Sequence, residues 1–139
     1  MALRRRKRDQ QGAAAVEFAL ILPIFLLMLF GIMDFGYMIN RSSIVNNAAR
    51  DGARQASLGE SEDVVRASVL NSLDGMPGAT VDVSCVPAAG NGPCTLASHA
   101  RGDEARVRVR YVHEFITPVQ MFFPGGVDLT RQAQMRIEE

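Results

Sequence analysis

A single carboxylate, Glu17, stands in an otherwise uncharged stretch that runs from Ala13 to Met33. A carboxylate inside an apolar helix is costly to bury, so it marks a candidate functional site. If the chain is cut after Gly12, Ala13 gains a free ammonium group one helical turn before Glu17. That amine can pair with this carboxylate or with the carboxylate of an adjacent subunit, and either pairing lowers the cost of burying the charge. The alternative is that Glu17 lies at the lipid interface and extends toward water.

The residues around this carboxylate favour a cut at Gly12. A glycine has no side chain to obstruct a protease cleft, and its backbone leaves a helix easily. Phe18 follows Glu17, and a basic cluster precedes Gly12. The candidate cleavage site is therefore Gly12–Ala13, and the candidate intramembrane site is Glu17 with Phe18.

Cys85 and Cys94 are the two cysteines of the chain, and they are nine positions apart. They form no CxxC motif, and His99 is the only imidazole nearby, so the spacing gives little support for a metal site. In an oxidising compartment the two thiols could form a disulfide that closes a short loop and adds roughly 2–3 kcal/mol. The alternative is a pair of unrelated buried thiols.

Other reactive side chains show no catalytic pattern. The histidines, His99 and His113, have no nucleophile motif around them, and Ser42 and Ser43 lie outside any triad context. The chain contains no glycine-rich phosphate loop, and no basic stripe with interleaved aromatic residues beyond its first residues. We therefore expect no enzyme activity, no cofactor, no metal and no nucleic-acid partner.

The apolar stretch that carries Glu17 is long enough to cross a membrane. Its 21 residues, 13–33, would span about 31 Å as a helix, close to the thickness of a hydrocarbon core. Residues 1–12 carry a net charge of +4 and residues 13–139 a net charge of −4. The positive-inside rule then places the N-terminus in the cytoplasm and the remainder outside it. The alternative is a secretory signal peptide, but the stretch is longer than a usual signal core, and no clean small-x-small cleavage site follows it.

The same helix is predicted to continue beyond the membrane. Helical spacing extends from about residue 14 to 58, with transmembrane character in about 13–36 and Gly59 as the C-cap. Pro23 removes one hydrogen bond and should kink this helix. A stripe of small residues could pack on the chain's own sheet or let a partner helix approach: Ala48, Ala49, Gly52, Ala53 and Ala56.

Residues 59–139 are predicted to form a small extracytoplasmic domain. A short amphipathic helix should follow Ser61, and alternating patterns predict strands near 81–85, 105–111 and 127–137. Arg106, Arg108 and Arg110 share one strand face, as a solvated row with acidic neighbours or as a basic contact surface. Residues 119–123 should form an apolar turn that packs in the core, with a contact site as the alternative. The predicted class is α+β, with a long N-terminal helix, a short second helix and a three-stranded antiparallel sheet.

Three segments carry a resemblance to a known family. The string GAAAVEFALILP from Gly12, the string FGIMDFG from Phe30 and the string NNAARDGAR from Asn46 resemble the TadE-like family. These are pilin-like proteins, or pseudopilins, of the tight-adherence (Tad, or Flp) pilus system. The resemblance implies a pilin-like fold and cleavage after Gly12 by a prepilin peptidase, with Ala13 as the new N-terminus and Glu17 as the helix charge.

The resemblance also implies partners and a location. They are the prepilin peptidase, other pilin-like subunits that pack helix to helix, a second minor pseudopilin and a short major pilin. The expected location is the cytoplasmic membrane, as a single-pass protein that can enter a pilus. Two alternatives remain: a membrane-anchored binding protein that never joins a filament, and a minor pseudopilin of a type II secretion system.

Overall fold

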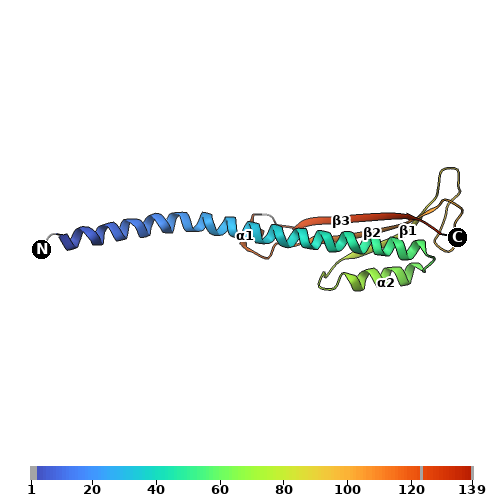
Figure 1. Cartoon of the computed structure of the whole chain (residues 1–139), viewed down its shortest axis with the longest axis horizontal. Helices are drawn as coiled ribbons and strands as arrows, with labels where there is room; N and C mark the ends of the chain where they lie inside the picture. The colour runs from blue at the N-terminus through green and yellow to red at the C-terminus, as the bar shows by residue number, and fades with distance from the viewer. Residues whose placement is uncertain (1–2, 123, 139) are drawn as a thin grey trace. The chain divides into compact units, whose positions relative to one another are not determined.

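The computed structural model describes residues 3–122 and 124–138, with side chains from Gly12 onward. Along the described chain the elements are α1 (Leu3–Ser57), α2 (Glu62–Ser72), β1 (Thr80–Val86), β2 (Glu104–His113), the 3-10 helix η1 (Pro118–Met121) and β3 (Val127–Arg136) (Figure 1). The predicted α+β class is confirmed: a long N-terminal helix, a short second helix and a three-stranded antiparallel sheet.

These elements fall into two compact units. The first unit comprises Met1–Tyr37 and Phe115–Pro124, and it contains the apolar part of α1 together with η1. The second unit comprises Met38–Glu114 and Gly125–Glu139, and it contains the C-terminal part of α1, α2 and the sheet. The boundary within α1 therefore lies close to the predicted end of the membrane segment.

Helix α1 is longer than the sequence predicted, because it begins at Leu3 and not near residue 14. Arginine, lysine and glutamine are good helix formers, and one glycine costs a helix only about 1 kcal/mol, so no residue in 3–13 stops the helix. Pro23 lies inside α1, and the helical assignment runs through it without a break. A kink at this proline stays a prediction.

Gly59 terminates α1 as predicted. Its φ of +89° is in the left-handed region that glycine adopts without strain. The N–H of Glu60 donates to the carbonyl of Gln55, and the N–H of Gly59 donates to the carbonyl of Ala56, both at 3.3 Å. These two bonds are the Schellman pattern, and they satisfy carbonyls that the helix end would leave unpaired.

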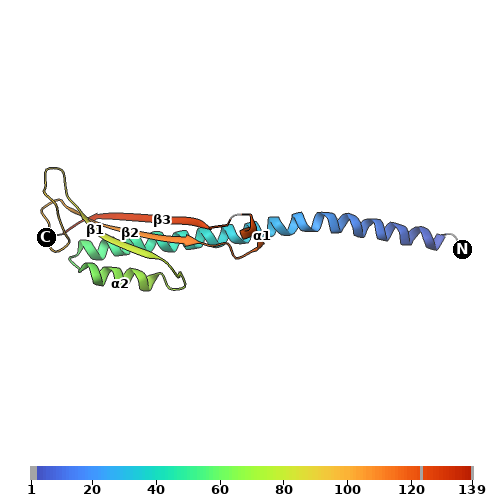
Figure 2. The same ribbon diagram turned by 180° about the vertical axis from the view of Figure 1, so that it is seen from behind.

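The three strands form an antiparallel sheet in the order β1-β2-β3, so that β2 is central (Figure 2). In the register, Val107 of β2 lies opposite Val83 of β1 and Ala133 of β3. Alternate residues of β2 are buried, and the arginines between them face outward. The predicted period-2 pattern therefore matches the face that each side chain occupies.

The hydrophobic core belongs to the second unit. Small residues of α1 lie in it together with valines of α2 and β2. A Cβ built on Gly52 would lie 2.5 Å from Cγ2 of Val69 on α2 and 3.2 Å from Cγ1 of Val107 on β2. Only a glycine lets α1 approach both elements this closely.

The connection between β2 and β3 corrects one prediction. Thr117 caps η1, and its Oγ1 accepts a hydrogen bond from the N–H of Val119 at 3.3 Å, with Pro118 at the first helical position. The apolar side chains of this turn are not core residues, because Met121 is 83% exposed and Phe122 is 68% exposed. Phe123, which was placed in the same turn, lies outside the described residues.

Candidate functional site

The apolar part of α1 is not covered by the rest of the described chain. Its most apolar 18-residue window has a mean hydropathy of 2.5, and none of that window is buried. Leu20 and Ile24, for example, are each 71% exposed. A core helix of a soluble protein would be mostly buried, whereas a membrane helix or an N-terminal signal sequence would be exposed in this way. One helix of the described chain is thus long and apolar enough to cross a membrane.

The predicted cleavage site lies within this helix. No atom of another segment comes within 4 Å of a Cβ built on Gly12, so this position is open on the helix surface. The helix continues through Ala13 to Glu17 and Phe18, so the residues at 13 and 17 are one turn apart on the same face. Cleavage at this bond and pairing of a new amine with Glu17 stay predictions.

Glu17 and Phe18 are both exposed. Among the residues whose side chains the structure describes, Glu17 has no ion-pair partner. Phe18 is 64% exposed, and the apolar residues near it on α1, such as Val16 and Leu20, are exposed to a similar degree. Both side chains therefore point away from the chain's own fold.

A second carboxylate of α1, Asp34, is almost completely buried, with 2% exposure. Its Oδ1 accepts a hydrogen bond from the backbone N–H of Ile116 at 3.1 Å, and its Oδ2 accepts one from Oγ1 of Thr117 at 2.5 Å. All three residues belong to the first unit. The carboxylate therefore holds the start of the η1 turn against α1, where both views place this turn beside the helix (Figures 1 and 2).

Sequence analysis missed the role of Asp34. It named Asp34 only within the string from Phe30 and gave it no partner. The available signal was a lone acid between Met33 and Phe35, since a carboxylate among apolar side chains needs donors. The donors lie 82 and 83 positions away in sequence, which no local pattern can show.

The predicted helix-packing face lies inside the second unit. Ala48, Ala49, Ala53 and Ala56 are at most 3% exposed, and Gly52 is also buried. These residues share one hydrophobic core with the chain's own sheet and α2. In this fold they have no exposed surface to offer a second helix.

Cys85 and Cys94 form a disulfide, with their Cα atoms 5.6 Å apart. The carboxylate of Asp103 lies close to their sulfur atoms. A disulfide offers no thiolate, and the thiolate is the form of cysteine that binds metals. We therefore treat this cluster as a structural clamp.

Asp103 organises the loop beside this disulfide. Its carboxylate accepts hydrogen bonds from the backbone N–H of Ala100 at 2.7 Å, from the side-chain amide of Asn91 at 2.6 Å and from the backbone N–H of Ala88 at 2.9 Å. These donors stabilise the charged form and hold the pKa of Asp103 below its usual value. One carboxylate thus fixes three points of the connection between β1 and β2.

The arginine row of β2 faces outward and has neighbours across the sheet. Arg110 forms an ion pair with Asp128 of β3 at 2.7 Å, and Arg108 donates to Oε1 of Gln132 at 3.3 Å. A hydrogen bond from Thr130, and then the charge of Arg110, lower the pKa of Asp128. This arrangement matches the prediction of a solvated row with acidic neighbours.

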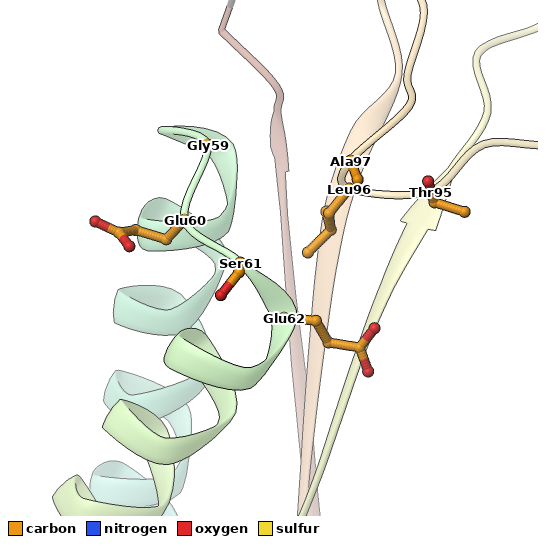
Figure 3. Close-up of a pocket in the computed structure, with 7 residues that line it drawn as sticks. All are labelled: Gly59, Glu60, Ser61, Glu62, Thr95, Leu96 and Ala97. Carbon is orange, nitrogen blue, oxygen red and sulfur yellow. The ribbon is translucent and has the colours of Figure 1, made fainter.

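One hollow of the second unit lies where α1 turns into α2 (Figure 3). Residues 59–62 and 95–97 line it. Glu60 and Glu62 point in different directions, and Ser61 has no imidazole among the lining residues (Figure 3). The hollow therefore lacks the paired groups that acid–base or nucleophilic catalysis would need.

Comparison with known protein families identifies the N-terminal part of the chain. Residues 12–54 match the family model described as TadE-like protein. This confirms the resemblance that the sequence strings indicated, and the matched segment contains both Glu17 and Asp34. Neither the curated proteins nor the solved structures include a match to this chain.

Proposed function

We propose that this chain is a minor pilin, or pseudopilin, of a Tad (Flp) type IV pilus system, which acts in pilus biogenesis, adhesion or secretion. A prepilin peptidase cuts it after Gly12, and the mature protein starts at Ala13. It is a subunit without catalytic activity or a cofactor of its own. One observation carries the proposal: the TadE-like match begins at Gly12 and covers the uncovered apolar helix that holds Glu17.

The proposed location follows from charge and hydropathy. The basic residues at 4–8 stay in the cytoplasm, the apolar part of α1 crosses the cytoplasmic membrane, and residues 59–139 lie outside. The exposure of Glu17 on the helix surface supports contact with a neighbouring subunit, since a carboxylate in lipid needs a partner. The partners are the prepilin peptidase, a second minor pseudopilin and the short major pilin.

Intact-mass analysis of the chain extracted from membranes tests this function. In cells with an active prepilin peptidase, the mature mass should begin at Ala13. In cells that lack the peptidase, the mass should include the basic leader. A chain that keeps its leader in both strains would contradict the proposal and favour a simple membrane-anchored binding protein.

The neighbouring genes separate a Tad subunit from a pseudopilin of a type II secretion system. The two share the cleavage signal, so the mass measurement alone does not distinguish them. A nearby ATPase gene and a gene for a short Flp-type pilin are expected here. A complete set of type II secretion genes in their place would contradict the Tad assignment.

A further inference from the structure

The segment between β2 and β3 has an unusual surface. From Phe115 to Val127 the sequence contains no charged residue. Ile116 and Phe122 are each 68% exposed, and Met121 is 83% exposed. Scattered apolar residues are normal on a protein surface, but three large ones gathered on an uncharged loop indicate a contact surface.

The hydrogen bonds of Asp34 fix the level of this loop along α1. The N–H of Ile116 lies 3.1 Å from Oδ1 of Asp34, directly after the apolar stretch that ends at Met33. The 3-10 helix that follows rises only about 2 Å per residue, so its four residues stay within about 10 Å of the Asp34 carboxylate. If α1 crosses the membrane, this places the loop in the polar zone of one leaflet, which is about 5–8 Å thick.

We propose that the apolar loop, residues 115–122, is a second membrane contact, which Asp34 holds against α1. Ile116, Met121 and Phe122 insert into the interfacial region of the lipid bilayer on the outer side. The occupant is lipid and not a second protein, because Asp34, which binds the start of the loop, is flanked on α1 by exposed apolar residues at Ile32, Met33 and Phe35. This inference rests on the proposed membrane crossing of α1.

The role of Asp34 follows from the free-energy cost of burying its carboxylate. A buried carboxylate at the edge of an apolar span is unfavourable unless donors satisfy it. The loop supplies two donors, a backbone N–H and a hydroxyl. In return the carboxylate orders a loop whose apolar side chains have no core to fill. Asp34 is thus a positioning residue, and the membrane contact is made by the loop.

Fluorescence quenching in lipid vesicles tests this proposal with the full chain. Met121→Cys carries an environment-sensitive NBD label, and the quenchers are lipids that carry a nitroxide either near the headgroup, at the depth expected for position 121, or deep in the acyl chain, at the depth expected for position 24. Ile24→Cys, within the apolar span, reports whether α1 lies in the bilayer, and Ala67→Cys, on the exposed surface of α2, reports water. The native disulfide leaves the introduced thiol as the site of labelling.

We expect labels at 24 and 121 to be quenched by nitroxide lipid and the label at 67 to be unaffected. A label at 121 that behaves like the one at 67, while the label at 24 is quenched, would overturn the loop proposal and leave the membrane span intact. A label at 24 that is not quenched would overturn the span itself, and with it both proposals. If the NBD label at position 121 reports a water-excluded environment only at a high protein-to-lipid ratio, the loop contacts a second copy of the chain. That result would overturn insertion into lipid.

A pair of variants tests the hydrogen bonds to the loop. Thr117→Val removes the hydroxyl donor, and Thr117→Ser keeps it. With the label at 121, we expect the valine variant to lose at least half of the quenching and the serine variant to keep it, while position 24 is unchanged in both. Equal quenching in the two variants would show that the Thr117 hydroxyl does not position the loop.

Discussion

Asp34 and Thr117 lie 83 positions apart in sequence, and one hydrogen bond of 2.5 Å joins their side chains. Asp34 belongs to the longest helix of the described chain, and Thr117 precedes a single turn of 3-10 helix. The bond joins the two segments of the first unit, which are the N-terminal part of α1 and one loop. Its removal should therefore be visible as a local change in that loop.

Asp34→Ala should free the loop without unfolding the sheet. The variant removes both acceptors for the loop, and a buried hydrogen bond to a charged group is worth about 1.5–3 kcal/mol. In detergent, chymotrypsin should cut near Phe122 faster than in the parent chain. Thr117→Ser is the matched control and should cut at the parental rate. Equal rates for Asp34→Ala and the parent would show that the carboxylate does not hold the loop.

Glu17→Gln should separate processing from assembly. The amide keeps the shape of the side chain and removes its charge, so recognition of Gly12 should be largely unaffected. Assembly should be impaired, because the amine of Ala13 would lack a carboxylate partner in lipid. Intact mass measures the first effect and pilus counts by electron microscopy measure the second. Normal piliation in this variant would exclude the ion-pair mechanism.

Gly52→Leu should destabilise the second unit. Even a single Cβ would lie 2.5 Å from Val69, and overpacking a core usually costs about 1–3 kcal/mol. The midpoint of thermal unfolding in detergent, followed by circular dichroism, should fall. Gly36→Leu is the control, because no atom of another segment lies within 4 Å of a Cβ at that position. If both variants melted alike, the close approach of α1 to α2 would be wrong.

Reduction of the Cys85–Cys94 disulfide should weaken the second unit. The bond closes a short loop, and such a cross-link contributes about 2–3 kcal/mol. Urea unfolding with and without dithiothreitol measures the difference. A Cys85→Ser/Cys94→Ser double variant should match the reduced parent and should not respond to the reductant. An oxidised parent no more stable than this variant would contradict the structural role.

Protonation of Asp103 in acid should lower the free energy of unfolding. Its pKa is lowered in the folded state, chiefly by the hydrogen bond from Ala100 and then by the bond from Asn91. Its contribution is therefore present above the unfolded-state pKa of about 3.9 and is lost as pH falls through the lower folded value. Urea midpoints between pH 6 and pH 2.5 measure this loss. The Asp103→Asn variant should be less stable than the parent at pH 6, and its urea midpoint should fall less on acidification. A variant with the same pH profile as the parent would refute the assignment.

Local patterns were sufficient for the secondary-structure elements and for the family resemblance. The alternation of Val107 and Val109 with arginines predicted β2, and the strings that begin at Gly12, Phe30 and Asn46 indicated the family whose model matches residues 12–54. Each of these patterns is local in the sequence. The predicted helix start failed because helix formers continue upstream, where the charge pattern suggested a boundary.

Long-range contacts account for what sequence analysis missed. The partners of Asp34 come from a loop that follows two further strands, and no periodicity relates them. The apolar turn after Thr117 was assigned to the core because its residue types suit a core. Its exposure depends on where Asp34 holds it, which is a tertiary contact.

The continuity of α1 through Gly12 has an electrostatic consequence for the proposed cut. Cleavage would make Ala13 the start of a shorter helix, and the first N–H groups of that helix would lose their carbonyl acceptors. The positive end of the helix macrodipole would then coincide with the new ammonium group. Glu17, within the first turn and a half, would face both positive charges at once. The cut would thus replace a strongly basic end by one whose charges nearly cancel within a few ångströms.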